Sequence, residues 1–517
     1  MLERLAWLAP VLPFMAAVWI AIGYAVGSNR GEGGERRTAA AAYVGTGGPL
    51  LVLLALGLQA LIEGPPGQVA IAPPWLESGG YRVWLSFTLD ALALSLGTLI
   101  ALISLLTVRF AAVYMHREPG FQRFFVVLSL FAAGMLLIVL AGNPVLTFVG
   151  WEVAGVSSYL LIGYAHDRPV ATQNATRVFV TNRIGDAGFV LGIFLAFVLV
   201  HDLEWPSLLA GTAQLDRLSV GFLLAGFLVA ALAKSALVPF APWIARALEG
   251  PTPSSAVFYG SLMVHAGVYL VLRLAPAFEH APAVLSLLGF FGLLTAVYGL
   301  LAGLTQTDAK SSLIFSTTGQ VGLMFLACGL GWFTLAAWHL AAHAAFRAWQ
   351  FLTSPQLLHR VATPSRPVPA WLTRSRRLYT ASLQRFWLDP LADVLLVRPT
   401  EGLARDIARF DDEIVQRVAG RPGHEGVIGS LAEWETQRQA GAAGQAPMQG
   451  HGAAGRLLVW VSDALAWLEE RLVLQAGGAS LKERLRVATR VLVQIDQLLA
   501  QPRYLLLMIM ATFVVIL

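Results

Sequence analysis

Ionisable side chains stand inside the most apolar segments of this 517-residue chain. Glu152 lies in GWEVAGVSSYLLIGY, and Lys234 ends the apolar run of ALAKSALVPFAPWIARALEGPTPSS. A charge in a lipid-embedded helix costs about 3 kcal/mol on insertion scales, so such a group faces protein or water and pairs with another group. An acid and a base in these places either carry protons or ions through a membrane or form a structural ion pair between two helices.

The same feature recurs in four further segments. The candidates are Arg183 and Asp186 in TNRIGDAGF, Tyr259 and His265 in FYGSLMVHAGVY, Asp308 and Lys310 in TQTDAKSSL, and His339, His343 and Arg347 in WHLAAHAAFRAW. The last three are spaced by four residues, so they share one face of an otherwise apolar helix and must turn that face into a bundle. Because the groups are so many, we predict that all of them form a proton pathway with Glu152 and Lys234.

Two prolines follow Lys234 at positions 239 and 242. A proline removes a backbone donor and clashes with the preceding turn, so Pro239 and Pro242 predict a broken helix. Broken membrane helices commonly line cavities in which ions bind. A lysine that is desolvated there and held beside a carboxylate is balanced between its charged and neutral forms, so it can gain and lose a proton.

The composition predicts a membrane protein, because 56% of the residues are hydrophobic and only 13% are charged. A soluble chain is normally about one quarter charged. The net charge of +5 is spread over loops and does not form a patch for nucleic acid. The single cysteine, Cys328, excludes a disulfide within the chain and a cysteine-cluster metal site. We expect no cofactor and no metal in this chain.

Hydropathy predicts an all-α polytopic membrane protein, since each span needs about 20 mostly apolar residues. We expect twelve spans, at about residues 5–26, 41–62, 84–114, 122–141, 144–164, 176–200, 218–245, 253–275, 284–305, 311–330, 332–352 and 503–517. Basic loops such as AHDRPVATQNATR alternate with basic-poor loops such as HDLEWPSLLAGTAQLD. This alternation predicts an outside N-terminus and a cytosolic end of the eleventh span, in a bacterial inner membrane.

The composition changes after the eleventh span. We therefore predict a transmembrane bundle at 1–352 with its core motifs at 84–352, a cytosolic or interfacial amphipathic region at 353–502 with a linker at about 436–455, and a last span at 503–517. The amphipathic region would dock a partner or clamp the bundle. A small cytosolic appendage is the alternative interpretation.

Five of these segments together resemble the antiporter-like subunits of respiratory complex I and the related cation/proton antiporters, the L or ND5 type above all. They are GWEVAGVSSYLLIGY, NRIGDAGF, AKSALVPFAPWIARALEGPTPSS, TQTDAKSSLIFSTTGQVGLMFLACGLG and WHLAAHAAFRAWQFL. The resemblance covers about residues 84–352. It implies a channel glutamate at Glu152, a central channel lysine at Lys234, an arginine–aspartate pair at Arg183 and Asp186, and a histidine pair at His339 and His343.

The sequence departs from this family pattern at three positions. Tyr259 stands where the family usually has a histidine, and His265 stands where complex I has a small polar residue. Arg347 replaces an expected lysine, and arginine stays charged at any physiological pH, so it is a poor proton relay. The chain also leaves the membrane after the eleventh span, where L-type subunits continue with further spans.

A shortened L-type chain of this length resembles the membrane subunits of the DabA–DabB inorganic-carbon transporters. That resemblance implies a large peripheral zinc-binding DabA-like partner on the cytosolic side, and a cation flow that drives the hydration of CO2 to bicarbonate. The zinc would belong to the partner.

Three other interpretations stay open. The chain could be a proton-pumping subunit of a complex I-like or hydrogenase-type redox complex, with the membrane subunits of that complex as its partners. It could be a subunit of a sodium/proton antiporter, or a membrane scaffold whose charges are structural. In each case membrane lipid is the surrounding medium, no nucleic acid is bound, and we expect no catalytic chemistry from this chain itself.

Overall fold

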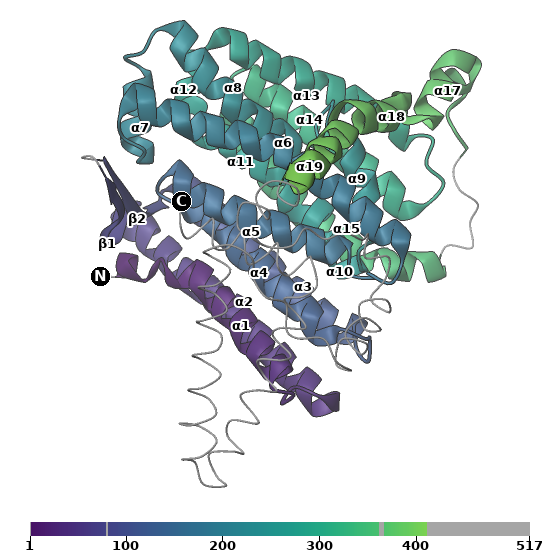
Figure 1. Ribbon diagram of the computed structural model, residues 1–517, viewed down its shortest axis with the longest axis horizontal. Coiled ribbons are helices and arrows are strands. Elements are labelled where there is room, and N and C mark those ends of the chain that lie inside the picture. The colour runs from purple at the N-terminus through teal and green to yellow at the C-terminus, as the bar shows by residue number, and fades with distance from the viewer. Residues whose placement is uncertain (1, 79–80, 361–366, 411–517) are drawn as a thin grey trace, which may run out of the picture. The chain divides into compact units, whose positions relative to one another are not determined.

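The computed structural model describes residues 2–78, 81–360 and 367–410 (Figure 1). Within these residues, ten helices are long and apolar enough to cross a membrane. The predicted multi-pass helical membrane fold is therefore confirmed. The described chain as far as Val397 belongs to one compact unit, and α19 (Arg398–Phe410) belongs to a second.

Long helices build the membrane region. They are α1 (Leu8–Ala25), α2 (Gly31–Glu63), α3 (Ala91–Tyr114), α4 (Phe121–Leu140), α5 (Pro144–Ile162), α6 (Pro169–Val200), α8 (Arg217–Lys234), α13 (Pro282–Gly303), α14 (Ala309–Gly329) and α15 (Phe333–Arg360). Shorter elements connect them. These are η1 (Leu2–Leu5), α7 (Trp205–Thr212), α9 (Pro242–Arg246), η2 (Ala247–Glu249), α10 (Thr252–Ser255), η3 (Ala256–Ser261), η4 (Met263–His265), α11 (Ala266–Arg273) and α12 (Ala275–Glu279).

The first ten predicted spans correspond to the ten candidate membrane helices, of which the eighth is the composite stretch Thr252–Arg273. The eleventh, 332–352, is the helix α15. Its histidines, arginines and other polar residues lower its mean hydropathy, and it is not one of the ten. The twelfth span, at 503–517, and the linker at 436–455 lie outside the described residues, as do the amphipathic segments beyond residue 410.

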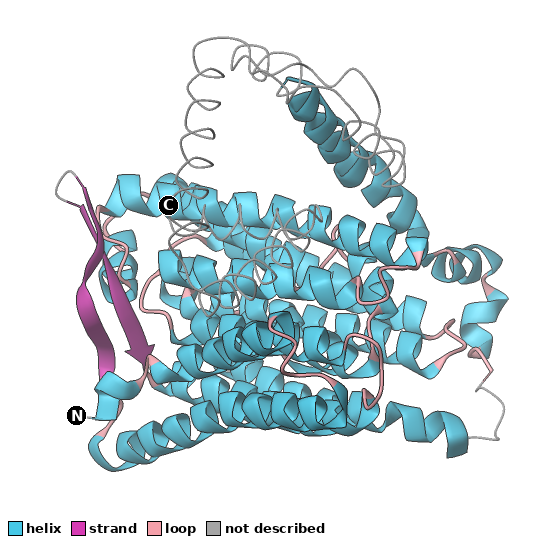
Figure 2. Cartoon of the chain, turned by 60° about the horizontal axis from the view of Figure 1, so that its bottom comes forward, coloured by secondary structure: helices cyan, strands magenta, loops and turns pink. Residues whose placement is uncertain are grey.

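The third predicted span, 84–114, begins too early. An antiparallel hairpin of β1 (Gly67–Ser78) and β2 (Tyr81–Leu89) occupies its first residues, and α3 starts only at Ala91. Asp90 marks the boundary because its side chain accepts a hydrogen bond from the Ala93 N–H at 2.8 Å, as an N-cap does. The hairpin, drawn in magenta in Figure 2, lies beside the helix ends.

Three further boundaries differ from the prediction, in the spans 41–62, 176–200 and 218–245. Helix α2 begins ten residues earlier, at Gly31, because its polar first turns extend beyond its apolar part. Helix α6 begins seven residues earlier, at Pro169, because proline suits the first helical turn and the helix continues beyond its apolar part. Helix α8 ends at Lys234, and the chain is irregular as far as α9. The predicted break is therefore present, and it starts at the lysine itself.

Small residues let the membrane helices pack closely. Helix α13 packs on α14, α6 on α8, α4 on α5, and α1 on both α2 and α4. At the α13–α14 contact, a Cβ on Gly299 would lie 2.4 Å from the backbone nitrogen of Gly319, so a larger residue would separate the helices. Such small-residue contacts are a usual means of helix association in lipid, where no hydrophobic force drives the helices together.

The loops gather at two opposite helix ends. At one end the loop after α3 contacts the start of α2, with Arg117 and Glu32 2.6 Å apart, and Tyr164 donates to the Pro119 carbonyl at 2.6 Å. We call this end the basic side, after its basic loops. The opposite end carries the β-hairpin and the starts of α3, α5 and α8, and we call it the hairpin side.

A carboxylate fastens the hairpin to the bundle. Glu204, just before α7, accepts hydrogen bonds from Gln68 of β1, from Ser86 of β2 at 2.5 Å and from Asn143 at 2.9 Å. Asn143 also caps α5 by accepting from the Leu146 N–H at 2.8 Å. Burial raises the pKa of Glu204, although the hydrogen bonds from Ser86 and Asn143 oppose the rise.

Residues 370–397, which follow α15 in the same compact unit, lie against the bundle. They comprise α16 (Ala370–Arg374), α17 (Arg376–Leu383), η5 (Arg385–Trp387), α18 (Leu388–Ala392) and η6 (Asp393–Val397). Asp389 pairs with Arg246 of α9 at 3.0 Å, and Asp393 pairs with Arg177 of α6 at 3.4 Å. These contacts favour a clamp over an independent appendage for the residues up to Val397, whereas the domain limits at 352 and 502 stay predictions.

We expect Glu204→Ala to lower the melting temperature of the detergent-solubilised protein by several degrees. The change leaves Ser86 and Asn143, both buried, without their acceptor, and an unsatisfied buried donor costs about 1–3 kcal/mol. Glu204→Gln keeps an accepting oxygen and should lose much less. Equal melting temperatures for the two variants would show that the carboxylate does not hold the hairpin.

The raised pKa of Glu204 also predicts a pH dependence. A carboxyl whose pKa is higher in the folded state stabilises the fold below its unfolded pKa of about 4.3, and this contribution is lost as the pH rises through the folded value. The melting temperature of the natural protein minus that of Glu204→Gln should therefore be larger at pH 4 than at pH 8. A difference that grows with pH would contradict this assignment.

Candidate functional site

Helices α5, α6 and α8 bring four charged residues together inside the bundle. Glu152, Asp186 and Lys234 keep only 5%, 4% and 1% of their surface exposed. Arg183 forms ion pairs with both acids: with Glu152 on the neighbouring helix, and with Asp186 at 2.7 Å, one turn further along α6. Three residues that the sequence places in two separate spans are thus in direct contact.

Trp151 links this group to Lys234. Its indole N–H donates to Asp186 Oδ1 at 2.7 Å, and its backbone carbonyl accepts from Lys234 Nζ at 3.0 Å. The lysine nitrogen also lies 4.9 Å from the centre of the indole ring, where the negative face of the ring stabilises a cation. We call Glu152, Arg183, Asp186 and Lys234 the charge cluster.

The break in the helix positions Lys234 as the last residue of α8. The backbone groups that the break leaves unpaired find side-chain partners: Trp243 donates to the Ala233 carbonyl at 2.8 Å, and the Val238 N–H donates to Thr295 at 3.0 Å. The irregular backbone is therefore satisfied inside the protein, as the membrane requires. These hydrogen bonds fix the backbone on the far side of the break, so the position of Lys234 at the end of α8 is well defined.

Several polar atoms beside the charge cluster have no hydrogen-bond partner among the described residues. They are Glu152 Oε1, Asn182 Oδ1 and Ser235 Oγ. Buried polar atoms are nearly always paired with protein or with ordered water. These three atoms therefore mark the positions where water molecules would bind next to Glu152 and Lys234.

A second group of predicted residues meets between η4, α14 and α15. His265 Nε2 and His343 Nδ1 are 2.9 Å apart, and Arg347 Nε donates to His343 Nε2 at 3.1 Å. Arg347 also donates to Ser316 of α14, and His339 shares a hydrogen bond with Gln320 at 2.9 Å. We call His265, His343 and Arg347, with the flanking His339, the histidine cluster.

The two clusters are neighbours through the packing of α8 on α11. A Cβ on Gly267 would lie 2.3 Å from the hydroxyl of Ser235, so the residue after Lys234 contacts the helix turn that follows His265. Gly267 is needed here because any side chain would collide with Ser235. The order along the bundle is therefore charge cluster, Ser235, histidine cluster.

The remaining predicted residues have other contacts. Tyr259 is fully buried and packs on the ring of Phe351, with ring centres 5.9 Å apart. Asp308 caps α14 by accepting from the Ser311 N–H at 2.8 Å, and Lys310 donates to Thr252 at 2.8 Å. That Tyr259, Asp308 or Lys310 takes part in a proton pathway stays a prediction.

A third buried group, which was not predicted from the sequence, lies on the hairpin side. Arg273, the last residue of α11, pairs with Asp90 and donates to the hydroxyl of Tyr269. Asp90 could have been found, because an aspartate directly before a long apolar run is a typical helix cap. Nothing in the sequence pairs it with Arg273, 183 residues away.

No group of three or more histidine, cysteine, aspartate or glutamate side chains that could hold a metal ion occurs in the described part of the chain. The ionisable groups that the two clusters bring together are carboxylate, guanidinium, amine and imidazole groups.

Comparison with family models agrees with this arrangement. Residues 141–370 match the model described as NADH:quinone oxidoreductase/Mrp antiporter, TM. Residues 75–125 match the model described as NADH-Ubiquinone oxidoreductase (complex I), chain 5 N-terminus. Both buried clusters lie within the first of these ranges.

Individual relatives are of the same kind. The chain is 35% identical over 368 residues to NAD(P)H-quinone oxidoreductase chain 5 of Synechocystis sp., an alignment that covers 69% of this chain and 53% of that one. It is 37% identical over 359 residues to NADH-quinone oxidoreductase subunit L of Mycobacterium tuberculosis, covering 68% and 55%. The chain thus spans about half the length of the curated relatives it matches.

Solved structures share the fold. A chain of the Mrp complex from Dietzia sp. superposes with a TM-score of 0.60 at 21% identity, covering 98% of this chain and 62% of that one. A chain of the archaeal membrane-bound sulfane sulfur reductase gives 0.58 at 22% identity, covering 70% and 57%. Together the comparisons support the antiporter-like, complex I subunit 5/L-type superfamily that the motifs predict.

Gly155 of α5 offers a test of the charge cluster. A Cβ at this position would lie 3.1 Å from Arg183 Nη2 and 3.2 Å from Lys234 Nζ. Both atoms end flexible side chains, so Gly155→Ala should fold with a melting temperature within a few degrees of the natural protein. Proton translocation in vesicles should fall severalfold, because the two cations must move.

Gly97→Ala on α3 is the matched control, since its Cβ would meet Leu53 at an ordinary 3.4 Å and no charged group. If both alanine variants translocate protons at the natural rate, the position of these cations does not matter for function.

Proposed function

We propose that this chain is a proton-translocating membrane subunit of a larger complex, of the kind found in quinone oxidoreductases and related antiporters. One observation carries the proposal: four charged side chains meet in the interior of a membrane bundle, beside a helix break and beside unpaired polar atoms. A bundle that needed only stability would be served as well by apolar residues. The similarity of residues 141–370 to the antiporter family supports the same function.

The charge cluster can respond to a single proton. When all four residues are ionised, the two acids and the two bases balance. If Lys234 gives its proton toward Ser235 and the histidine cluster, one negative charge is left in excess. In a medium of low dielectric constant that excess is costly, so the cluster takes up a replacement proton on Glu152 or Lys234. Each departure of a proton thus drives the next uptake.

Arg347 prepares the histidine cluster to receive the proton. Its Nε–H donates to His343 Nε2, so that ring nitrogen accepts, and neutral His343 carries its hydrogen on Nδ1. That hydrogen points at His265 Nε2, 2.9 Å away. Arg347 keeps its own charge and only fixes the tautomer, so His343 keeps its Nδ1 hydrogen and an arriving proton is taken up on His265 Nε2.

The basic side would face the cytosol, with the N-terminus outside, in a bacterial inner membrane. The basic loops of that side support this orientation, since lysine and arginine are enriched in cytosolic loops. The clamp formed by Asp389 and Asp393 would then lie on the cytosolic face, beside α9 and α6.

Membrane subunits of a redox or antiporter complex are the partners that the similarities favour. The relatives in Synechocystis and M. tuberculosis are named as quinone oxidoreductase subunits, and the fold is shared with a chain of an Mrp complex. These comparisons support the redox-complex interpretation above the DabA–DabB interpretation. The experiments described below also test the two other interpretations, which are carbon transport with a zinc-binding partner and sodium/proton exchange.

We expect Lys234→Met and Glu152→Gln each to lower proton translocation by about 100-fold, the order of the contribution of a positioned acid–base group. The full-length chain, with the subunits that co-purify, is reconstituted in vesicles and assayed with a pH-sensitive dye. Methionine keeps the bulk of the lysine, and glutamine keeps an acceptor for Arg183. Asp202→Asn in an exposed loop serves as the control and should keep the natural rate.

Full translocation by both variants, with assembly intact, would leave the charges a purely structural role. A rate that follows a sodium gradient and ignores the proton gradient would replace proton translocation with sodium transport.

The identity of the complex is tested by purification of the tagged chain in mild detergent. We expect flavin- and iron–sulfur-containing subunits with quinone-dependent activity, or other antiporter subunits, in the purified material. A single large zinc-containing protein in their place would support carbon transport instead. Mass spectrometry and metal analysis of the same sample distinguish these results.

A further inference from the structure

A stripe of polar residues leads from the histidine cluster to the hairpin side. Tyr269 and Arg273 of α11 and His265, the N-cap of that helix at the end of η4, follow one another at intervals of four residues, so they lie along one side of this helical stretch. Two helical turns, about 12 Å, separate the first from the last. All three are buried, with 3%, 2% and 7% of their surface exposed. Proton translocation as proposed above needs a route out of the histidine cluster, and this stripe is continuous with it.

A small cavity lies between the first two residues of the stripe. It measures about 20 Å³, and both His265 and Tyr269 line it. The other lining residues are apolar and come from α3, α4 and α15, with Leu262 and the first residue of α11, Ala266. A volume of about 10–15 Å³ is enough for one water molecule, which needs at least two polar partners. The two polar residues in the wall supply them.

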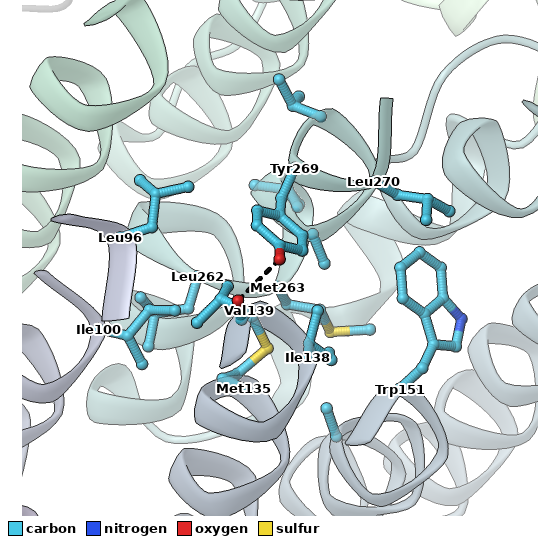
Figure 3. Packing of buried hydrophobic residues seen from close by; sticks show 14 of the residues in the cluster. Leu96, Ile100, Met135, Ile138, Val139, Trp151, Leu262, Met263, Tyr269 and Leu270 are labelled. Carbon is cyan, nitrogen blue, oxygen red and sulfur yellow. Dashed lines mark hydrogen bonds between the residues drawn. The ribbon is translucent and has the colours of Figure 1, made fainter. Parts of the chain in front are cut away.

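Tyr269 closes the far end of the cavity. Its hydroxyl donates to the Val139 carbonyl of α4 at 2.7 Å, and Figure 3 shows this bond among Leu96, Met135 and Leu262. The same hydroxyl oxygen accepts from Arg273 Nε at 3.2 Å and from Arg273 Nη2 at 3.1 Å. The tyrosine oxygen is thus the next polar atom beyond the cavity on the way to Arg273.

Asp90 ends the stripe at the membrane edge. It pairs with Arg273, and 38% of its side chain is exposed. Its Oδ1 lies 3.1 Å from Arg273 Nη2, the nitrogen that also contacts the Tyr269 oxygen at 3.1 Å. Two oxygens bound to one nitrogen at these distances are about 6 Å apart at most. One bridging water molecule spans such a gap, since each of its hydrogen bonds is about 2.8 Å long.

We propose that the cavity binds a water molecule that connects His265 to Tyr269, and that Tyr269 and Asp90 form the exit of the proton route on the hairpin side. This inference rests on the proposed function. Arg273 is a positioning residue, because it holds the tyrosine oxygen and the carboxylate in place and keeps its own protons.

The transfer conserves protons at each step. Arg273 Nε first releases the Tyr269 oxygen, whose two lone pairs otherwise accept from Nε and Nη2. His265 then gives the proton that it has received to the cavity water, which passes one of its protons to the freed lone pair of the Tyr269 oxygen. As the tyrosine hydroxyl rotates away from Val139, its original proton leaves to the water beside Asp90 and then to the outside solution. Every group returns to its starting form, and one proton has moved.

Two substitutions separate this route from a structural role of the same residues. Tyr269→Phe removes one oxygen and keeps the ring. Val139→Ile adds one methylene to the wall of the cavity and removes no polar group. We expect each variant to assemble and to lower proton translocation by at least about tenfold per assembled complex, as the loss of a proton relay does.

The controls make equal changes elsewhere. Tyr114→Phe removes a hydroxyl that contacts Thr252 on the basic side, and Val113→Ile adds a methylene on a side chain that is 80% exposed. Both should keep the natural rate. If Tyr269 only fastens α11 to α4, Tyr269→Phe lowers the melting temperature and leaves the rate per complex unchanged.

Lys234→Met in the same vesicles separates the two proposals. If Lys234→Met translocates at the natural rate, proton translocation through the charge cluster itself is refuted. If it is inactive while Tyr269→Phe or Val139→Ile translocates at the natural rate, the exit route alone is refuted. If Val139→Ile does not assemble, Tyr269→Phe decides the question.

Discussion

Arg183 holds the buried charges together, because it is in contact with both Glu152 and Asp186. Removing one partner from a buried pair leaves an uncompensated charge, at a cost of about 3–5 kcal/mol. Lys234 is bound differently, by a carbonyl and the face of an indole ring. A direct ion pair with a carboxylate would favour the charged form of the amine more strongly than the carbonyl and the indole ring do. The proton that can leave is therefore on the lysine, and the fixed charge is on the arginine.

The surrounding fold holds Arg183 and Lys234 in these two different environments. Trp151 binds Asp186 through its indole and Lys234 through its carbonyl, so one residue of α5 sets the distance between α6 and the end of α8. The helix break satisfies its free backbone groups with Trp243 and Thr295. Lys234 can then be fully buried at a helix end without an unpaired backbone beside it. The clamp on α9, through Asp389, braces the second half of the broken helix.

The sequence predicted the helical membrane fold, the break after Lys234 and the face shared by His343 and Arg347, because each depends on local spacing. It could not predict which helices touch. That Arg183 meets Glu152, and that His265 meets His343 78 residues away, follows from packing that no single span encodes. The hairpin before α3 was missed, because its apolar residues continued directly into an apolar helix.

The most direct test is the protonation state of Lys234. The chain contains only three lysines, so ¹⁵N-lysine labelling gives few signals, and Lys310→Arg and Lys482→Arg assign the one from Lys234. We expect this signal to change between the ammonium and the amine form within the pH range in which the complex translocates protons, and to respond to Glu152→Gln. A Lys234 signal that stays in the ammonium form throughout, and ignores Glu152→Gln, would show a static ion and contradict proton transfer through this cluster.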